Sequence, residues 1–211
     1  MEAAVKAGDV KALRDRTGAG MMDCKAALTE ADGDLDKAVD ILRVKGQAQA
    51  AKRGERAASE GLVTSYVHAT GKIGVLVEVD CETDFVARTE PFEEFGRDVA
   101  LHIAAAAPRY VSEDEVPQED KDAEMRILQE QAAASVSGPS GARGKPEEVQ
   151  KKIAEGRMRK WLEEVVLLHQ THVNPDKHGG KTIEQLRTEL AASTGENVVI
   201  VRFVRFQIGE E

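Results

Sequence analysis

The chain has 211 residues, of which 41% are hydrophobic and 32% are charged, a composition typical of soluble globular proteins. Its net charge of −9 disfavours a general binder of phosphate backbones, because such proteins cluster Lys and Arg. Two cysteines are too few for a disulfide framework and lack metal-ligand spacing. No apolar run reaches the ~20 residues of a membrane span, and no signal peptide is recognisable. We therefore expect a soluble cytoplasmic protein that binds neither membrane nor nucleic acid directly.

The first 46 residues are expected to form a module of three short helices. Asp9 is a candidate cap for a first helix that ends at Thr17. Residues 18–20 (GAG) then favour a tight turn, because glycine supplies the backbone freedom that such a turn requires. A second helix is expected over residues 22–30, with residues 26–28 facing inward.

The third helix is expected to follow a turn at residues 32–34 (DGD), whose last aspartate is a candidate cap, and to end at Gly46. Its apolar side chains recur at helical spacing, at Leu35, Ala38, Val39 and Leu42. Residues 47–60 are rich in alanine and in basic residues and form the expected connector to a second domain. A solvated linker is the favoured interpretation of this charge, and a contact with RNA or with an acidic protein surface is the alternative.

Residues 61–211 are expected to form an α+β core in which an antiparallel sheet packs with helices. The segments 61–67 and 73–81 flank a turn at residues 69–72, a pattern typical of a β-hairpin. Residues 198–206 (VVIVRFVRF) are the strongest strand signal in the chain. Helices are expected over residues 89–107, 118–134, 146–169 and 182–190, and loops over residues 135–145 and 171–181. The spacing of Phe92, Phe95, Val99 and Ile103 places them on one side of the first of these helices.

The terminal strand contains two arginines whose spacing is irregular for a strand. Arg202 and Arg205 are three positions apart, so strict alternation cannot place both on one face of a sheet. A β-bulge or a change of environment between them is therefore expected.

Residues 78–88 (EVDCETDFVAR) form an acidic corner between the second hairpin strand and the helix that follows. Exposed loops held by a rigid scaffold are where functional side chains concentrate. Phe85 stands out here, because an aromatic side chain in a polar corner is either buried core or a contact residue. Met21 and Met22 pose the same choice on the small helical module, and methionine is an adaptable contact residue at binding surfaces.

The usual signs of enzyme chemistry are incomplete. Residues 180–182 (GKT) resemble the end of a phosphate-binding loop, but Pro175 occupies the position of its first glycine. His169, His172 and His178 lack the context of a metal site and are interpreted as surface or loop histidines. Glu82 and Asp84 form a possible acid pair without a recognisable catalytic partner. We therefore predict no catalytic residues, no metal and no cofactor.

Two segments resemble the signatures of the translation elongation factor Ts family. Residues 13–28 (LRDRTGAGMMDCKAAL) resemble the first signature, and residues 78–88 resemble the second. The likeness continues through residues 102–106, 144–147 and 195–197 into the terminal strand. Asp80 departs from the family, which usually has Asn at this position.

The resemblance implies a function, a partner and site residues. Family members are guanine-nucleotide exchange factors for elongation factor Tu, which they bind with GDP and without nucleotide. Their N-terminal module resembles a ubiquitin-associated domain. Met21, Met22 and Lys25 match its contact positions, and Thr83, Asp84, Phe85 and Val86 match the segment that enters the nucleotide domain of Tu. A chain with a single core unit implies a homodimer.

Two other functions remain open at this level. A helical adaptor would use only the small N-terminal bundle to bind other proteins, which leaves the second signature unexplained. An enzyme would use Glu82 and Asp84, for which no complete site is recognisable.

Overall fold

A computed structural model describes residues 5–17, 19–134 and 147–210. The chain divides into two compact units. The first contains Met1–Ala104 together with Glu184–Glu211, and the second contains Ala105–Ile183. Within the described residues, no helix is long and apolar enough to cross a membrane.

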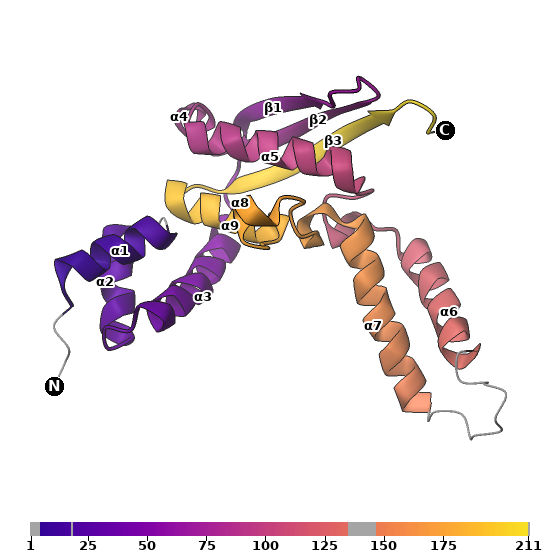
Figure 1. The fold of residues 1–211 in the computed structure, drawn as a ribbon, viewed down its shortest axis with the longest axis horizontal. Coiled ribbons are helices and arrows are strands. Elements are labelled where there is room, and N and C mark those ends of the chain that lie inside the picture. Colours follow the sequence, from indigo (N-terminus) through magenta and orange to yellow (C-terminus); the bar gives the residue numbers. More distant parts are fainter. Residues whose placement is uncertain (1–4, 18, 135–146, 211) are drawn as a thin grey trace. The chain divides into compact units, whose positions relative to one another are not determined.

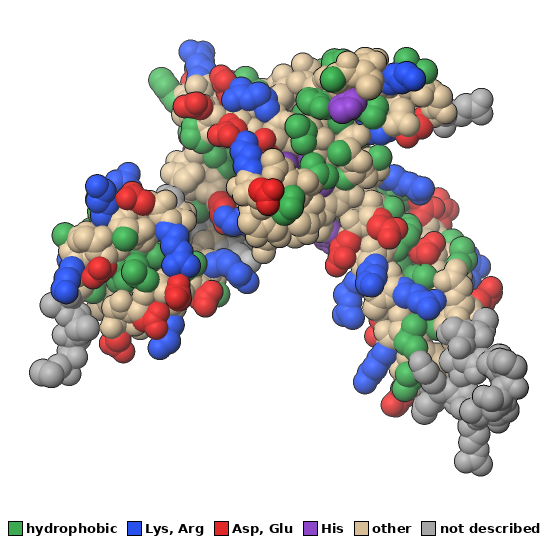
Figure 2. Space-filling view, viewed as in Figure 1, with side chains coloured by type: hydrophobic (Ala, Val, Ile, Leu, Met, Phe, Trp, Pro, Cys, Tyr) green, Lys and Arg blue, Asp and Glu red, His purple; other side chains and the backbone are tan. Residues whose placement is uncertain are grey.

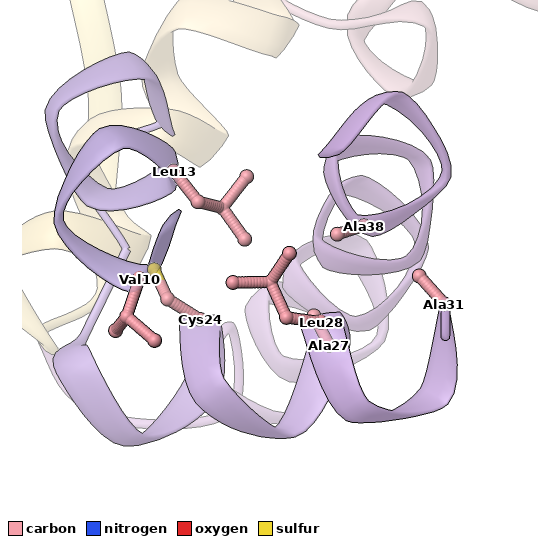
Figure 3. Close-up of a cluster of buried hydrophobic side chains, with 7 residues drawn as sticks. All are labelled: Val10, Leu13, Cys24, Ala27, Leu28, Ala31 and Ala38. Atoms are coloured by element: carbon pink, nitrogen blue, oxygen red, sulfur yellow. The ribbon is translucent and has the colours of Figure 1, made fainter. Parts of the chain in front are cut away.

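The N-terminal part of the first unit is a bundle of helices α1 (Ala7–Thr17), α2 (Met21–Glu30) and α3 (Leu35–Arg53). Leu13 and Leu28 meet fully buried between the three helices (Figure 3). The predicted stripe on α3 is confirmed, since Ala38 is buried and its apolar neighbours pack against the same cluster. The cluster consists of Val10, Leu13, Cys24, Ala27, Leu28, Ala31 and Ala38.

Three local predictions about this bundle are wrong. Helix α1 begins at Ala7, so Asp9 lies inside its first turn instead of capping it. Ala26 is exposed, because α2 turns only Cys24, Ala27 and Leu28 toward the core. Helix α3 continues through Gly46 to Arg53, which shows that one glycine with ~1 kcal/mol lower helix propensity than alanine does not end a helix.

The predicted cap of α3 is confirmed. The carboxylate oxygen Oδ1 of Asp34 accepts hydrogen bonds from the backbone N–H groups of Asp36 at 3.0 Å and Lys37 at 3.1 Å. The backbone at Asp32 and Gly33 has positive φ values of 50° and 84°, the conformation that the turn before α3 requires. These bonds satisfy N–H groups that have no partner inside the helix.

The other part of the first unit is an antiparallel sheet of three strands in the order β1-β2-β3, which confirms the α+β fold class. Its strands are β1 (Glu60–Val67), β2 (Ile73–Cys81) and β3 (Val198–Gln207). Helix α5 (Glu90–Ala106) lies along one face of the sheet (Figure 1). Phe92, Val99 and Ile103 are fully buried on the inner side of α5, as their spacing predicts. Helix α9 (Ile183–Thr194) precedes β3.

The irregularity of β3 lies before both arginines. The register shifts so that Glu78 pairs with Arg202 and Val79 pairs with Ile200, which leaves Val201 as the extra residue of a bulge. From Arg202 onward the side chains alternate regularly between the two faces of the sheet, so the prediction of a bulge between Arg202 and Arg205 is wrong. The two arginines face opposite sides of the sheet, with side-chain exposures of 80% for Arg202 and 11% for Arg205.

The second unit contains two long helices, α6 (Gln118–Ala134) and α7 (Glu147–Val165). They pack against each other through Leu128, Ala154 and Met158. Lys and Arg side chains are interspersed with Asp and Glu over both helices (Figure 2). The predicted loop at residues 135–145 lies outside the described residues. The short helices η1 (Glu113–Glu115), η2 (Leu167–His169) and α8 (Pro175–His178) complete the unit, and α8 lies where only a loop was expected.

Candidate partner-binding site

The acidic corner folds into a single helical turn, α4 (Asp84–Ala87), directly after β2 ends at Cys81. Thr83 has extended backbone angles and caps this turn, because its hydroxyl oxygen accepts a hydrogen bond from the N–H of Val86 at 3.4 Å. Ala87 is buried and fixes the inner side of the turn. The chain then enters α5 through Thr89, whose hydroxyl donates to the carbonyl of Val86 at 2.8 Å.

Phe85 lies on the outer side of this turn and is 81% exposed. This placement decides between the two interpretations of the sequence, because Phe85 contributes nothing to the core. Asp84 beside it forms an ion pair with Arg88 at 2.9 Å, one helical turn further on. Arg88 is highly exposed, so the pair is solvated and adds little to stability. Val86 is half-buried between the exposed and buried sides. The corner therefore presents an apolar ring next to a carboxylate.

A network of backbone and side-chain hydrogen bonds holds this corner against the turn between α9 and β3. The Oε2 atom of Glu196 accepts from the N–H groups of Glu82 and Thr83, each at 3.0 Å. Its Oε1 atom accepts from the hydroxyl of Thr83 at 2.6 Å. In return, Oε1 of Glu82 accepts from the N–H of Asn197 at 2.6 Å and from the Arg56 guanidinium at 3.4 Å.

These contacts also settle the acid pair considered from the sequence. The Glu82 carboxylate binds Asn197 and Arg56, whereas the Asp84 carboxylate binds Arg88, so the two acids have separate partners. Behind them, the Cys81 thiol donates to the carbonyl of Thr83 at 3.1 Å. Burial raises the pKa of the Cys81 thiol, which keeps it protonated and therefore able to donate.

The second group of predicted contact residues lies on α2. Met21 and Met22 occupy its first turn with exposures of 51% and 74%, and Lys25 is exposed one turn later than Met21. Cys24 is fully buried in the core cluster of the bundle, so its thiol is not part of this surface. Neither methionine is a core residue, and α2 therefore presents two adaptable apolar side chains and one cation.

The three histidines considered from the sequence, His169, His172 and His178, lie in the second unit. His172 is 2% exposed, and its Nδ1 atom accepts from the N–H of Asn174 at 3.0 Å. Its ring meets that of His178 edge to face, with centroids 4.2 Å apart. His169 lies 4.0 Å from the Glu113 carboxylate. His172 is therefore a loop histidine, as one of the two expected alternatives, but it is buried and not on the surface.

Comparison with known proteins identifies the family. The family model described as elongation factor TS matches residues 24–210. The chain belongs to the elongation factor Ts family. Elongation factor Ts of Carboxydothermus hydrogenoformans is 53% identical over 202 residues, which cover 95% of this chain and 88% of that protein. Elongation factor Ts of Caldanaerobacter subterraneus is 51% identical over 206 residues, or 98% of each chain.

Within this Ts-family chain, the sequence located the exposed residues of the corner but not the residues that support them. Glu196, Asn197 and Arg56 were missed as functional candidates, although residues 195–197 had contributed to the resemblance. Glu196 and Thr83 are 113 positions apart, and a contact at that separation has no periodicity or local spacing to reveal it. The only local signal is Gly195, whose φ of 77° ends α9 and turns Glu196 toward β2.

Proposed function

We propose that this chain is a guanine-nucleotide exchange factor that promotes GDP release from elongation factor Tu in the cytoplasm during translation elongation. It would do so as a binding protein, without making or breaking a covalent bond. Membership of the elongation factor Ts family supports the activity and the partner. The observation that carries the mechanism is the exposure of Phe85, next to Asp84, on a turn that follows a fixed backbone. The Glu196 carboxylate accepts hydrogen bonds from the two N–H groups that precede this turn.

In the proposed mechanism, Asp84 and Phe85 insert into the nucleotide domain of Tu, with Thr83 and Val86 completing the contact. An 81% exposed ring gains nearly its full burial energy when a partner covers it, about 1.5–3 kcal/mol. That gain corresponds to about one to two decades in an equilibrium constant. Since coupling is reciprocal, the factor weakens GDP binding by the same ratio by which GDP weakens binding of the factor.

One inserted ring is insufficient for a complete switch. Shifting a two-state population from 1:99 to 99:1 takes about 5.5 kcal/mol of differential binding. The exposed Met21, Met22 and Lys25 on α2 provide a second contact with Tu in this proposal, formed by the module of residues 1–46. Two contacts allow one to hold the partner while the other disturbs the nucleotide site.

Replacing Phe85 with alanine tests the insertion. The variant is expected to slow catalysed release of a fluorescent GDP analogue from Tu by about 10- to 100-fold, because it loses about 1.5–3 kcal/mol of binding energy. Its circular dichroism is expected to match the parent, because the ring has no core contacts to lose. Ile127→Ala is the matched control, since Ile127 is 49% exposed on α6 and outside the proposed contact. Stopped-flow traces identical to the parent at equal occupancy would refute the insertion.

We also propose that the chain forms a homodimer through the sheet face opposite α5. This face carries large apolar side chains with no covering element among the described residues, including Val67 at 68%, Phe206 at 68% and Leu76 at 47% exposure. All three strands contribute to it, so it is a continuous surface, and large exposed apolar patches mark interaction sites. A two-fold axis makes such a face self-complementary.

The mass of the protein in solution tests the dimer. Leu76→Glu places a carboxylate at the centre of the face and is expected to convert a dimer into a monomer in analytical ultracentrifugation. The matched control is Ile127→Glu, which adds the same charge on α6. A parent protein that sediments as a monomer at micromolar concentration would refute the proposal.

A further inference from the structure

We propose that Glu196 is a positioning residue for nucleotide exchange, which holds the α4 turn in the orientation that presents Asp84 and Phe85. This inference rests on the proposed function. Glu196 does not touch the partner in this account. It acts through Thr83, the residue that caps the turn.

The α4 turn cannot hold its own shape. It has four residues, and a helix this short is unstable in water because nucleation fixes several residues for a single hydrogen bond. Phe85 gives it no packing energy, and Ala87 is its one buried side chain. The orientation of Phe85 therefore depends on what holds the residues before the turn.

Glu196 supplies that restraint with both carboxylate oxygens. One oxygen binds two successive backbone N–H groups, those of Glu82 and Thr83, and fixes the plane of the peptide that enters the turn. The other accepts the hydroxyl proton of Thr83. A hydroxyl has a single proton, so its lone pairs are then left to accept from the N–H of Val86. Glu196 thus orients the cap hydroxyl as well as the backbone.

Glu196 is itself held rigidly. Gly195 ends α9 with a left-handed backbone, and its N–H donates to the carbonyl of Ala191 at 3.0 Å. Next to Glu196, the backbone N–H of Asn197 binds the Glu82 carboxylate at 2.6 Å. The Asn197 amide, 3% exposed, donates to the carbonyl of Arg56 at 2.9 Å. The Glu196 carboxylate therefore binds the backbone at Glu82, the Glu82 carboxylate binds the backbone at Asn197, and these bonds join the two turns.

Hydrogen bonds to an ionised group contribute more than neutral ones, and a carboxylate is the side chain that best accepts from three donors at once. Glu196→Ala removes all three bonds. Glu196→Gln keeps an amide oxygen for the two N–H groups and an amide nitrogen beside the Thr83 hydroxyl. The glutamine variant is therefore expected to recover most of the lost rate.

The test measures release of a fluorescent GDP analogue from Tu against the concentration of the factor. Glu196→Ala is expected to lower the maximal release rate by about tenfold. The concentration at half-maximal rate is expected to change by less than about threefold, because the α2 contact is intact. Glu115→Ala is the matched control, since the Glu115 carboxylate also accepts a backbone N–H, that of Val111 at 2.9 Å. This control is expected to leave both parameters unchanged.

A double-mutant cycle separates positioning from a general loss of structure. If Glu196 acts through Phe85, the Glu196→Ala change adds less than about twofold in the Phe85→Ala background. Equal effects in both backgrounds would overturn the inference, as would a parent-like rate for Glu196→Ala while Phe85→Ala is slow. The second outcome leaves the proposed function standing. If Phe85→Ala also behaves like the parent, the proposed function itself fails.

Hydrogen exchange provides the second readout. Glu196→Ala is expected to increase exchange at the amides of Thr83 and Val86, and to do so more than Glu196→Gln, while leaving the paired amides of β1 and β2 protected. Unchanged exchange at Thr83 and Val86 in the alanine variant would overturn the inference, whatever the release rate.

Discussion

Gly96 is the position where α5 approaches the sheet most closely, and adding one methyl group there has a calculable effect. A Cβ atom at Gly96 would lie 2.6 Å from the hydroxyl oxygen of Thr64 on β1 and 3.4 Å from its Cβ atom. Real Cβ atoms essentially never approach another heavy atom within 3.0 Å, so Gly96→Ala requires α5, β1 or the Thr64 side chain to shift. Thr64 has little freedom to turn aside, because two of its three staggered rotamers place a heavy atom in this space and β-branched side chains are stiff at χ1.

Two opposing contributions set the size of the effect. Overpacking a closely packed interior costs about 1–3 kcal/mol. Replacing glycine with alanine inside a helix recovers about 1 kcal/mol of helix propensity. Gly96→Ala alone is therefore expected to destabilise the first unit by up to about 2 kcal/mol. In a Thr64→Ala background the nearest atom is gone, and the same change is expected to stabilise by up to about 1 kcal/mol. The sign of the effect reverses.

Hydrogen exchange of the paired amides of β1 and β2 in urea, followed by mass spectrometry, measures the free energy of unfolding of the first unit directly. Fluorescence is unsuitable, because the single tryptophan, Trp161, lies on α7 of the second unit. The four proteins of the cycle give the coupling energy, which is expected to be about 1–3 kcal/mol. Additivity within about 0.5 kcal/mol would refute the close approach of α5 and β1.

Three further changes test other parts of the structure. Replacing both Met21 and Met22 with alanine is expected to weaken binding to Tu while sparing the fold, since both side chains are exposed; parent-like affinity in titration calorimetry would contradict their contact role. Burial, and then the neighbouring Glu78, raise the pKa of Asp80 above its ordinary value of 3.8. The charged form is therefore disfavoured in the folded state, so Asp80→Asn is expected to raise the midpoint of thermal unfolding at pH 7, with a gain that vanishes as the pH falls to 3.8. An increase in the unfolding midpoint that becomes larger as the pH falls would contradict this prediction. Hydrogen bonding to the N–H of Lys37 lowers the pKa of Asp34, so Asp34→Ala is expected to lower the unfolding midpoint of the bundle at pH 7. This loss is expected to disappear below pH 3.8, and a difference that does not change with pH would contradict the role of the charged cap.

Local periodicity was enough to predict most of the elements. The spacing of Phe92, Val99 and Ile103 identified the inner face of α5, and the hairpin of β1 and β2 followed from its flanking strands and turn. Both signals depend on residues only a few positions apart. The exposure of Phe85 was left open, because a polar context fits both a buried and an exposed aromatic.

Features that depend on distant parts of the chain, and the end of helix α3, were not predicted. The bulge at Val201 reflects a register with β2 that only the paired strands define. The continuation of α3 through Gly46 shows that neighbouring helix formers outweigh one weak residue. The bonds from Glu196 to the backbone of Glu82, and from the Glu82 carboxylate to the backbone of Asn197, join positions more than 110 residues apart. The sequence showed these acidic side chains but not which residues they bind.

The long separation between Thr83 and Glu196 has a consequence for the newly made chain. The core of the helical bundle lies within the first 42 residues, so its contact surface is complete early in synthesis. The restraint on α4 is missing until residue 196 has left the ribosome, and at about 5–20 residues per second this takes several seconds to tens of seconds longer. Under the proposed function, a nascent or truncated chain would therefore bind elongation factor Tu without promoting GDP release. In the proposed mechanism, the ability to bind precedes the ability to exchange by most of the time that the ribosome spends on this protein.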